Sequence, residues 1–265
     1  MQSFFHLISK YIYKNIFNFL KYDFSEYIPN SKGSPFVINR LIKENIKNHT
    51  KNLLEISEWF NKVEVKNLRD LKSDKKTVYS LNNLFEKYGS DKNKHGYDFL
   101  YAYLFSKISK TPRILEIGIG TNNENIASNM GGKGKPGASL KAFSDYFPNS
   151  EIYGADVDTN ILFNSGNIKT FYLDQNNIES FHNEKIENKH FDLIIDDGLH
   201  MQSANLNTIR FALQKLKPGG LLVIEDIPTS ALGTWKIINN LIKKPFNLEI
   251  IKCTDNYVVV LSLQK

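Results

Sequence analysis

The sequence contains very little cysteine and no long hydrophobic run. Cys253 is the single cysteine among 265 residues, so an internal disulfide is impossible and a reducing, cytoplasmic environment is expected. No apolar run reaches the roughly 18 residues that a membrane-spanning helix needs. The N-terminus shows no basic segment followed by a small-residue cleavage site, so a signal peptide is not expected. These absences favour a cytoplasmic globular protein.

The sequence also lacks the basic, aromatic-interleaved stripes that are typical of nucleic-acid-binding proteins, so no nucleic-acid partner is expected. Its net charge is +6, and most of that excess falls in residues 1–75. Within residues 7–20, apolar side chains recur at helical spacing between lysines, which predicts an amphipathic helix. This helix is expected to pack against the body of the protein or against a second subunit of a homo-oligomer. Peripheral contact with an anionic membrane is the less favoured alternative.

Two regions with different patterns divide the chain. Residues 1–80 are predicted to form a helical N-terminal region, and residues 81–265 an α/β domain. From residue 111 onward, short apolar segments alternate with helix-length segments, which predicts a mostly parallel sheet covered by helices on both faces. The last two apolar segments, FNLEIIKC and YVVVLSLQ, are separated only by TDN, so they are predicted to pair antiparallel.

A pair of glycines ends the first strand of the predicted sheet. Gly118 and Gly120 permit a tight turn with close backbone approach to a ligand, and Glu116, just inside the strand, is grouped with them as a candidate cofactor-binding residue. A dinucleotide fingerprint requires a third glycine, and Asn123 occupies that position. The glycine pair therefore favours a nucleotide-type ligand but argues against a cradle for a pyrophosphate.

Acids end the second and third predicted strands. Asp156 can accept hydrogen bonds from both hydroxyls of a ribose, and Asp174 with Gln175 can bind the amino group of an adenine. Ligands of open α/β sheets bind at the carboxyl ends of the strands, where these residues are predicted to lie. The set suits an adenosine without phosphates. Each acid alone could equally be a helix cap.

Six stretches match those of a known enzyme family, in order, between about residues 80 and 230: YGSDKNKHGY, LEIGIGT, GASLKAFSDYFPNSEIYGADVD, DQNN, DLIIDDGLHM and LLVIEDI. They resemble class I S-adenosylmethionine-dependent methyltransferases, and more narrowly the metal-dependent sugar O-methyltransferases of the mycinamicin deoxysugar type. The resemblance implies an α/β, doubly wound, mostly parallel seven-stranded sheet in the order 3-2-1-4-5-7-6, with strand 7 antiparallel. It implies S-adenosylmethionine as cofactor, and it places Lys92, His95 and Tyr97 near the methionine end of the cofactor or at the mouth of the substrate pocket.

Four acids end the fourth and fifth predicted strands. Asp196-Asp197 and Glu225-Asp226 follow neighbouring strands, which lie about 4.8 Å apart, so their carboxylates can converge outside the sheet. Converging carboxylates repel one another unless a cation joins them, and oxygen ligands with open positions suit Mg²⁺. The resemblance implies that the metal ligands are Asp197, Glu225 and Asp226.

A histidine follows the first acidic pair. A metal that binds a sugar hydroxyl lowers its pKa, and a histidine can then take the proton at neutral pH. The resemblance implies that His200 is this base, with Asp197 beside it in the catalytic group. Asp196, grouped with the cofactor-binding residues, is expected to be a supporting or structural residue. The alternative is that the acids cap helices and that His200 is a surface residue.

The function predicted from the sequence is the metal-assisted transfer of a methyl group from S-adenosylmethionine to a sugar hydroxyl. The substrate is expected to be a small-molecule sugar that is carried on a nucleotide or destined for a surface polysaccharide. Two alternatives remain: a non-catalytic S-adenosylmethionine-binding partner in a biosynthetic complex, and an NAD-dependent oxidoreductase, which the missing third glycine disfavours.

Overall fold

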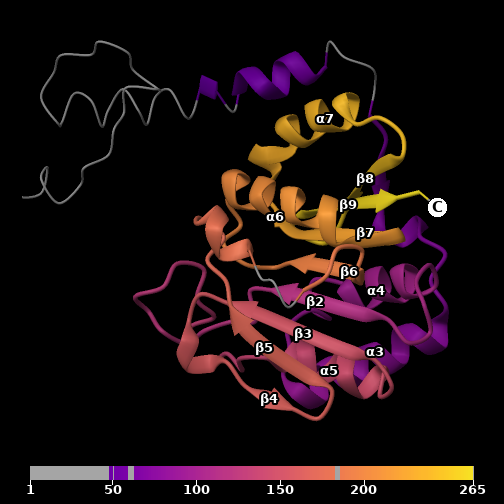
Figure 1. Cartoon of the computed structure of the whole chain (residues 1–265). Helices are drawn as coiled ribbons and strands as arrows, with labels where there is room; N and C mark the ends of the chain where they lie inside the picture. The colour runs from indigo at the N-terminus through magenta and orange to yellow at the C-terminus, as the bar shows by residue number, and fades with distance from the viewer. Residues whose placement is uncertain (1–47, 50, 59–62, 183–185, 265) are drawn as a thin grey trace, which may run out of the picture.

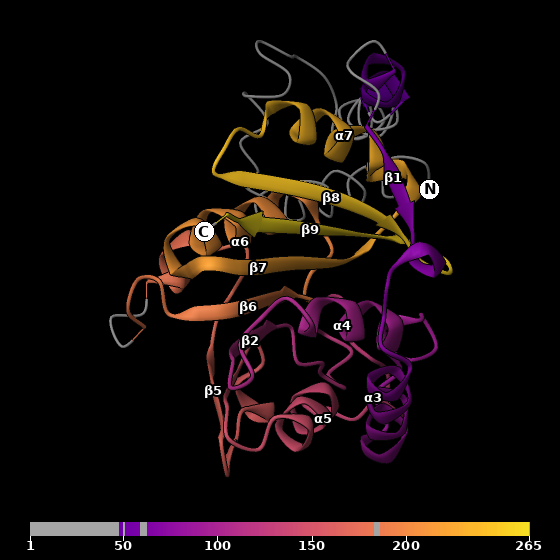
Figure 2. The ribbon, with the colours of Figure 1, turned by 90° about the vertical axis from the view of Figure 1, so that its right-hand side faces the viewer.

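A nine-stranded mixed sheet runs through the structure, a computed structural model that describes residues 48–49, 51–58, 63–182 and 186–264. The strand order is β1-β8-β9-β7-β6-β2-β3-β5-β4 (Figures 1 and 2). Neighbours are parallel, except that β9 is antiparallel to β7 and β8, and β4 to β5. The strands are β1 Val65–Asn67, β2 Arg113–Ile117, β3 Glu151–Asp156, β4 Asn164–Ser165, β5 Ile168–Tyr172, β6 Phe191–Asp196, β7 Leu216–Ile227, β8 Phe246–Lys252 and β9 Tyr257–Leu263.

The sheet has two more strands than the sequence predicts, one at each edge. β1 has three residues and β4 has two, so neither is long enough to show an alternating apolar pattern. Each uses the free backbone groups that an edge strand offers. The predicted seven-stranded sheet is therefore corrected to the nine-stranded order above, within which the seven predicted strands keep their relative order. Between the two edges the order is β8-β9-β7-β6-β2-β3-β5, and the closing hairpin β8–β9 is antiparallel, as predicted.

Helices cover both faces of the sheet (Figure 1). One face packs against α3 Lys75–Tyr88, α4 Tyr97–Phe105 and α5 Ala138–Tyr146, and the other against α6 Gln202–Lys215 and α7 Leu232–Leu241. Short 3₁₀ helices occupy four connections: η1 Leu68–Asp70, η2 Thr159–Ile161, η3 Ile178–Phe181 and η4 Thr229–Ala231. In the described ranges no helix combines the length and the apolar character that a membrane crossing requires.

The two faces of the sheet explain why its strands are almost continuously apolar. Along β6, Leu193 and Ile195 pack in the cluster under α3–α5, while Ile194 packs in the cluster under α6 and α7. Successive side chains of a strand point to opposite faces, so a strand buried on both sides has no polar face. All three side chains are fully buried.

The connection between α3 and α4 brings a polar loop over the carboxyl ends of the strands. Asp74 caps α3 by accepting a hydrogen bond from the Thr77 amide, 2.9 Å away. Gly89 ends the helix in the left-handed conformation, with φ 76°. Loop residues 90–96 follow, and Gly96, with φ 78°, leads into α4. The helix boundaries thus fix where this loop lies.

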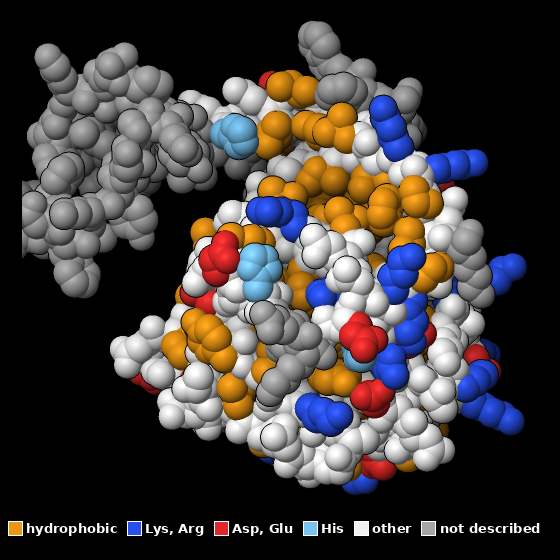
Figure 3. Space-filling view, viewed as in Figure 1, with side chains coloured by type: hydrophobic (Ala, Val, Ile, Leu, Met, Phe, Trp, Pro, Cys, Tyr) orange, Lys and Arg blue, Asp and Glu red, His pale blue; other side chains and the backbone are white. Residues whose placement is uncertain are grey.

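Most of the predicted N-terminal region, including the amphipathic segment 7–20, lies outside the described residues, so its role stays a prediction. The described part joins the α/β body: β1 pairs with β8, α3 begins before residue 80, and residues 51–57 are helical. That helix approaches α7 closely, because a Cβ added to Gly233 would lie 2.6 Å from the Leu54 nitrogen. Hydrophobic side chains gather on the surface between α7 and α6 (Figure 3).

Candidate functional site

Two adjoining cavities lie at the carboxyl edge of the sheet, where the strands of the predicted ligand site end. The first, of about 270 Å³, lies beyond β2, β3 and β5, and the second, of about 150 Å³, beyond β2, β6 and β7. Both are lined by Gly118, Gly120 and Asp197. Ser128, from the loop over residues 122–136, also lines both cavities and donates a hydrogen bond to the Leu199 carbonyl at 3.2 Å.

The turn after β2 requires a glycine at position 118. Gly118 has φ 86°, and a Cβ there would lie 2.3 Å from the Asp197 carbonyl oxygen and 2.4 Å from the Gly198 Cα. The Gly118 amide donates to the Ala155 carbonyl at 2.8 Å. The glycine therefore lets the turn after β2 contact the turn after β6, and it joins the two cavities.

The two acids predicted to hold adenosine line the first cavity. Asp156 is almost buried, and its two oxygens accept hydrogen bonds from the amides of Ile119 and Asp158, both at 2.9 Å. Burial raises the pKa of Asp156, and the hydrogen bonds oppose that rise. Asp174 accepts from the Asn176 amide at 2.9 Å. Both acids thus order their own turns, and carboxylate oxygens retain acceptor capacity for ribose or adenine.

Gln175 and Asp196 hold the turn that follows β6 through a buried network of hydrogen bonds. The Gln175 amide group donates to Asp196 at 2.7 Å and to Thr208 at 3.0 Å, while its carbonyl accepts from the Leu199 amide at 2.7 Å. Asp196 is fully buried, accepts also from Asn205 at 3.1 Å, and lines neither cavity. Gln175 reaches the cavity wall with its amide already engaged, so the geometry favours a positioning role for both residues.

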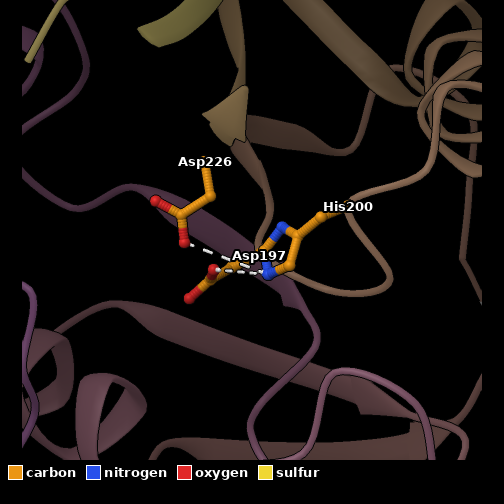
Figure 4. A group of neighbouring side chains, drawn as sticks. All are labelled: Asp197, His200 and Asp226. Carbon is orange, nitrogen blue, oxygen red and sulfur yellow. Dashed lines mark ion pairs between the residues drawn. The ribbon is translucent and has the colours of Figure 1, made fainter. Parts of the chain in front are cut away.

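The second cavity brings together the polar residues predicted for catalysis and metal binding. His200 Nε2 lies 3.9 Å from Asp197 Oδ1 and 3.9 Å from Asp226 Oδ2, so the imidazole faces both carboxylates (Figure 4). One ligand atom from each residue lies within 4.8 Å of the others. The cavity is also lined by Lys92, His95, Tyr97 and Glu225.

A buried lysine joins the acids of three neighbouring strands. The Lys92 ammonium lies 2.5 Å from Glu225 Oε2, 2.8 Å from Asp197 Oδ2 and 3.2 Å from Glu116 Oε1. Burial raises the pKa of Glu225 and of Glu116, while the Lys92 charge opposes that rise. The three carboxyls keep Lys92 protonated, although burial alone would lower its pKa. Glu116 is fully buried, lines neither cavity and therefore acts through Lys92.

Hydroxyl and amide groups hold the remaining oxygens of the acids. Tyr101 donates a short hydrogen bond to Glu225 Oε1. Tyr97 donates to Asp226 Oδ1 at 2.6 Å, and the Asn256 side chain donates to the same oxygen. Both Glu225 oxygens are therefore engaged. Asp226 keeps one oxygen, Oδ2, which faces His200.

The backbone at the site adopts conformations that L-residues rarely populate. His200 and Asp226 have φ of 55° and 56°, and Ser128, which lines the same cavity, has φ 58°. Such a conformation costs roughly 1–3 kcal/mol per residue and is retained only where the surrounding structure determines it. These three belong to the four non-glycine residues with positive φ among those that the structure describes. The strain thus concentrates at this cavity.

The chemistry of these groups fits a divalent cation. Within the described residues, Asp197 Oδ1 and Asp226 Oδ2 accept no hydrogen bond, and both face His200 Nε2, close enough to each other to share an ion. His200 Nδ1 is buried and has no hydrogen-bond partner among the described residues. Oxygen-rich groups with few protein ligands suit Mg²⁺, which retains water or substrate oxygens. Glu225, the third predicted ligand, faces Lys92 instead.

Three contributors to the site were missed by the sequence prediction. They are Tyr101, Asn256 and Ser139, which donates to Glu116 at 2.5 Å. Tyr101 could have been found, because it lies one helical turn after Tyr97 and so shares its face of α4. Asn256 lies in the β8–β9 turn, and nothing in its local sequence indicates that this turn reaches Asp226.

The sheet and the helices that cover its two faces form a class I S-adenosylmethionine-dependent methyltransferase fold. Its solved neighbours include the MycE methyltransferase of the mycinamycin pathway in complex with Mg and SAH, with TM-score 0.55 and 24% identity. That similarity covers 70% of this chain and 55% of the neighbour. A second MycE structure, which also contains mycinamycin VI, matches with the same score and coverage.

Sequence relatives confirm the resemblance to sugar O-methyltransferases, although no family model matches the chain. The chain is 28% identical over 160 residues to the 8-demethyl-8-alpha-L-rhamnosyl tetracenomycin-C 2'-O-methyltransferase of Streptomyces olivaceus, covering 60% of this chain and 40% of that protein. It is 32% identical over 123 residues to the mycinamicin VI 2''-O-methyltransferase of Micromonospora griseorubida, covering 44% and 28%. The matches thus span less than half the length of these relatives.

Proposed function

We propose that the protein transfers a methyl group from S-adenosylmethionine to a sugar hydroxyl, with the help of a divalent cation. The main observation behind this proposal is that the two cavities adjoin at Gly118, which lines both. One is bordered by Asp156 and Asp174, and the other contains Asp197, His200 and Asp226. A methyl donor in the first cavity can present its reactive end to a nucleophile in the second.

The first cavity favours an adenosine without phosphates. The amides of Gly118 and Ile119, which would have to cradle a pyrophosphate, already donate to the Ala155 carbonyl and to Asp156. This disfavours the NAD-dependent oxidoreductase. The acids at the ends of β3 and β5 offer acceptors for hydroxyl and amino groups, which adenosine has.

The second cavity favours a cationic occupant. Four carboxyl groups lie at this site against one ammonium. Lys92 contacts Glu116, Asp197 and Glu225, and Asp226 lines the same cavity. An excess of acid at a buried site raises carboxyl pKa values unless a cation relieves it. Both a divalent ion and the sulfonium of S-adenosylmethionine carry positive charge, so the cavity suits them together.

The residues of the second cavity divide the chemistry between them. Asp197 and Asp226 are proposed to hold Mg²⁺, which when bound would lower the pKa of a sugar hydroxyl. His200 is proposed to take the proton of that hydroxyl, since its Nε2 faces the free oxygens of both acids. Lys92 and Tyr97 hold the other oxygens of the two acids and so fix the direction in which they point.

A sugar is the proposed acceptor because the sequence relatives are named for methylation of rhamnosyl, mycinamicin and olivosyl compounds. We further propose that the sugar is linked to a nucleotide or belongs to a surface polysaccharide. The alternative from a different class is a non-catalytic S-adenosylmethionine-binding partner. The site argues against it, since a binding module has no need for His200 between two acids.

The proposal is tested by an acceptor panel with isotopically labelled S-adenosylmethionine and Mg²⁺. Its three arms are deoxysugar glycosides, nucleoside diphosphate sugars and polysaccharide fragments. Label in an acceptor, with one S-adenosylhomocysteine formed per methyl transferred, is the expected result. Transfer to glycosides alone would correct the nucleotide and polysaccharide part. Cofactor binding without transfer in every arm would favour the non-catalytic partner, and NAD reduction would favour the oxidoreductase.

A further inference from the structure

Lys92 occupies the centre of the acidic site rather than its rim. Its side chain is 4% exposed, and its ammonium contacts Glu116 of β2, Asp197 after β6 and Glu225 of β7. These strands are neighbours in the order β7-β6-β2. Lys92 itself comes from the loop between α3 and α4. The long, flexible side chain of Lys92 is therefore held among acids to which the proposed metal would also be attracted.

The contacts of Lys92 decide which oxygens remain open. They take Asp197 Oδ2 and Glu225 Oε2, while Tyr101 takes the other Glu225 oxygen. Asp197 Oδ1 and Asp226 Oδ2 remain, both facing His200. Without Lys92, the site would offer a cation up to two further carboxylate oxygens. It would also lose the positive charge that repels the cation.

We propose that Lys92 is a positioning residue that restricts the divalent site to Asp197 and Asp226 and keeps its affinity low. This inference rests on the proposed metal site. Hard cations take six or more oxygen ligands, so each ligand that the protein withholds leaves a position for a substrate hydroxyl. An ion bound by all the acids would have fewer open positions. Loss of Lys92 should therefore tighten metal binding and slow methyl transfer together.

A purely structural role for Lys92 predicts the opposite change in affinity. Removing one partner of a buried ion pair leaves uncompensated charge and loosens the surroundings. Asp197 would then be less well placed, and metal binding would weaken. The sign of the change in metal affinity thus separates positioning from structural support, and it is measured without any turnover.

The experiment compares the full-length wild type with Lys92→Met. Each protein is titrated with Mn²⁺, and the free Mn²⁺ is measured by electron paramagnetic resonance. The expected dissociation constant of Lys92→Met is lower by about tenfold or more, because a nearby positive charge has been removed. Lys135→Met is the matched control: Lys135 lines the same cavity but makes no ion pair with the described acids, so Mn²⁺ affinity should not change.

A second variant keeps the inference testable if Lys92→Met does not fold. Lys92→Met with Glu116→Gln removes one buried charge of each sign and should also bind Mn²⁺ more tightly than wild type. Unchanged or weaker binding in the folded variant, with wild type binding normally, would overturn the role of Lys92 and leave the proposed function standing. A wild type that binds no Mn²⁺ would overturn both this inference and the metal in the proposed function.

Discussion

The two cavities use their acids in opposite ways. In the first, Asp156 accepts hydrogen bonds from two backbone amides, that of Asp158 in its own turn and that of Ile119 in the turn after β2. In the second, Asp197 and Asp226 are held by side chains from distant parts of the chain, at Lys92 and Tyr97. These backbone amides order the turns that border the first cavity. Distant side chains instead take one oxygen of each acid and leave the other open.

Substitutions in the two cavities should therefore change different measured properties. A change at Asp156 or Asp174 should act on cofactor affinity, since both acids line the first cavity and neither lines the second. A change in the second should act on turnover or on metal affinity. The two should respond together at the residues that line both cavities, Gly118, Gly120, Ser128 and Asp197. Each of the following changes separates the cavities or joins them.

The largest effect is expected for His200→Ala in the second cavity. A general base contributes roughly 10²–10⁴-fold to the rate, so methyl transfer should fall by that factor. S-adenosylhomocysteine affinity, measured by calorimetry, should not change. Raising the pH should restore part of the rate, because hydroxide can then take the proton. A variant with the wild-type rate at neutral pH would remove His200 from the chemistry.

Gly118→Ala should damage both cavities at once. The new Cβ would lie 2.3 Å from the Asp197 carbonyl oxygen and would require φ 86°, so we expect a loss of about 2–4 kcal/mol in the free energy of unfolding. Cofactor and metal affinity should both fall. Gly131→Ala is the matched control, since Gly131 has φ 68° but no atom within 4 Å of the added Cβ. Equal losses in denaturant unfolding would mean that the close approach is unimportant.

Tyr101→Phe should destabilise the second cavity more than Tyr97→Phe does. It leaves a buried Glu225 oxygen without its donor, which costs about 1–3 kcal/mol. Tyr97→Phe leaves Asp226 with its Asn256 contact and should cost less. Thermal unfolding of the two variants compares them directly. The reverse ranking would contradict the assignment of Glu225 as a buried, supported acid.

Asp156→Ala should show the smallest effect and confine it to the first cavity. Loss of the ribose contacts should weaken S-adenosylhomocysteine binding by about tenfold, since one or two hydrogen bonds to a charged group are removed. Mn²⁺ affinity should stay at the wild-type value. An unchanged cofactor affinity would show that Asp156 serves only the amides of Ile119 and Asp158.

The sequence predicts the position of the acids better than their partners. Strand-end acids such as Asp156, Asp197 and Asp226 follow apolar runs, and parallel strands bring such ends to one edge. The roles of Lys92 and Glu225 could not be predicted in the same way. Their ion pair joins residues 133 positions apart, and it depends on how the α3–α4 loop lies over the sheet. The edge strands β1 and β4 could not be predicted, because strands of three and two residues are too short to show an alternating apolar pattern.

In the proposed function, one cavity binds the cofactor and its neighbour binds the metal that turnover needs. It is tested by measuring methyl transfer and S-adenosylhomocysteine affinity in parallel on one preparation, before EDTA, after EDTA and after Mg²⁺ is restored. EDTA should abolish transfer, Mg²⁺ should restore it, and the affinity should stay constant throughout. Transfer that persists in excess EDTA would contradict the metal site, and an affinity that falls with the metal would contradict the separation of the two cavities.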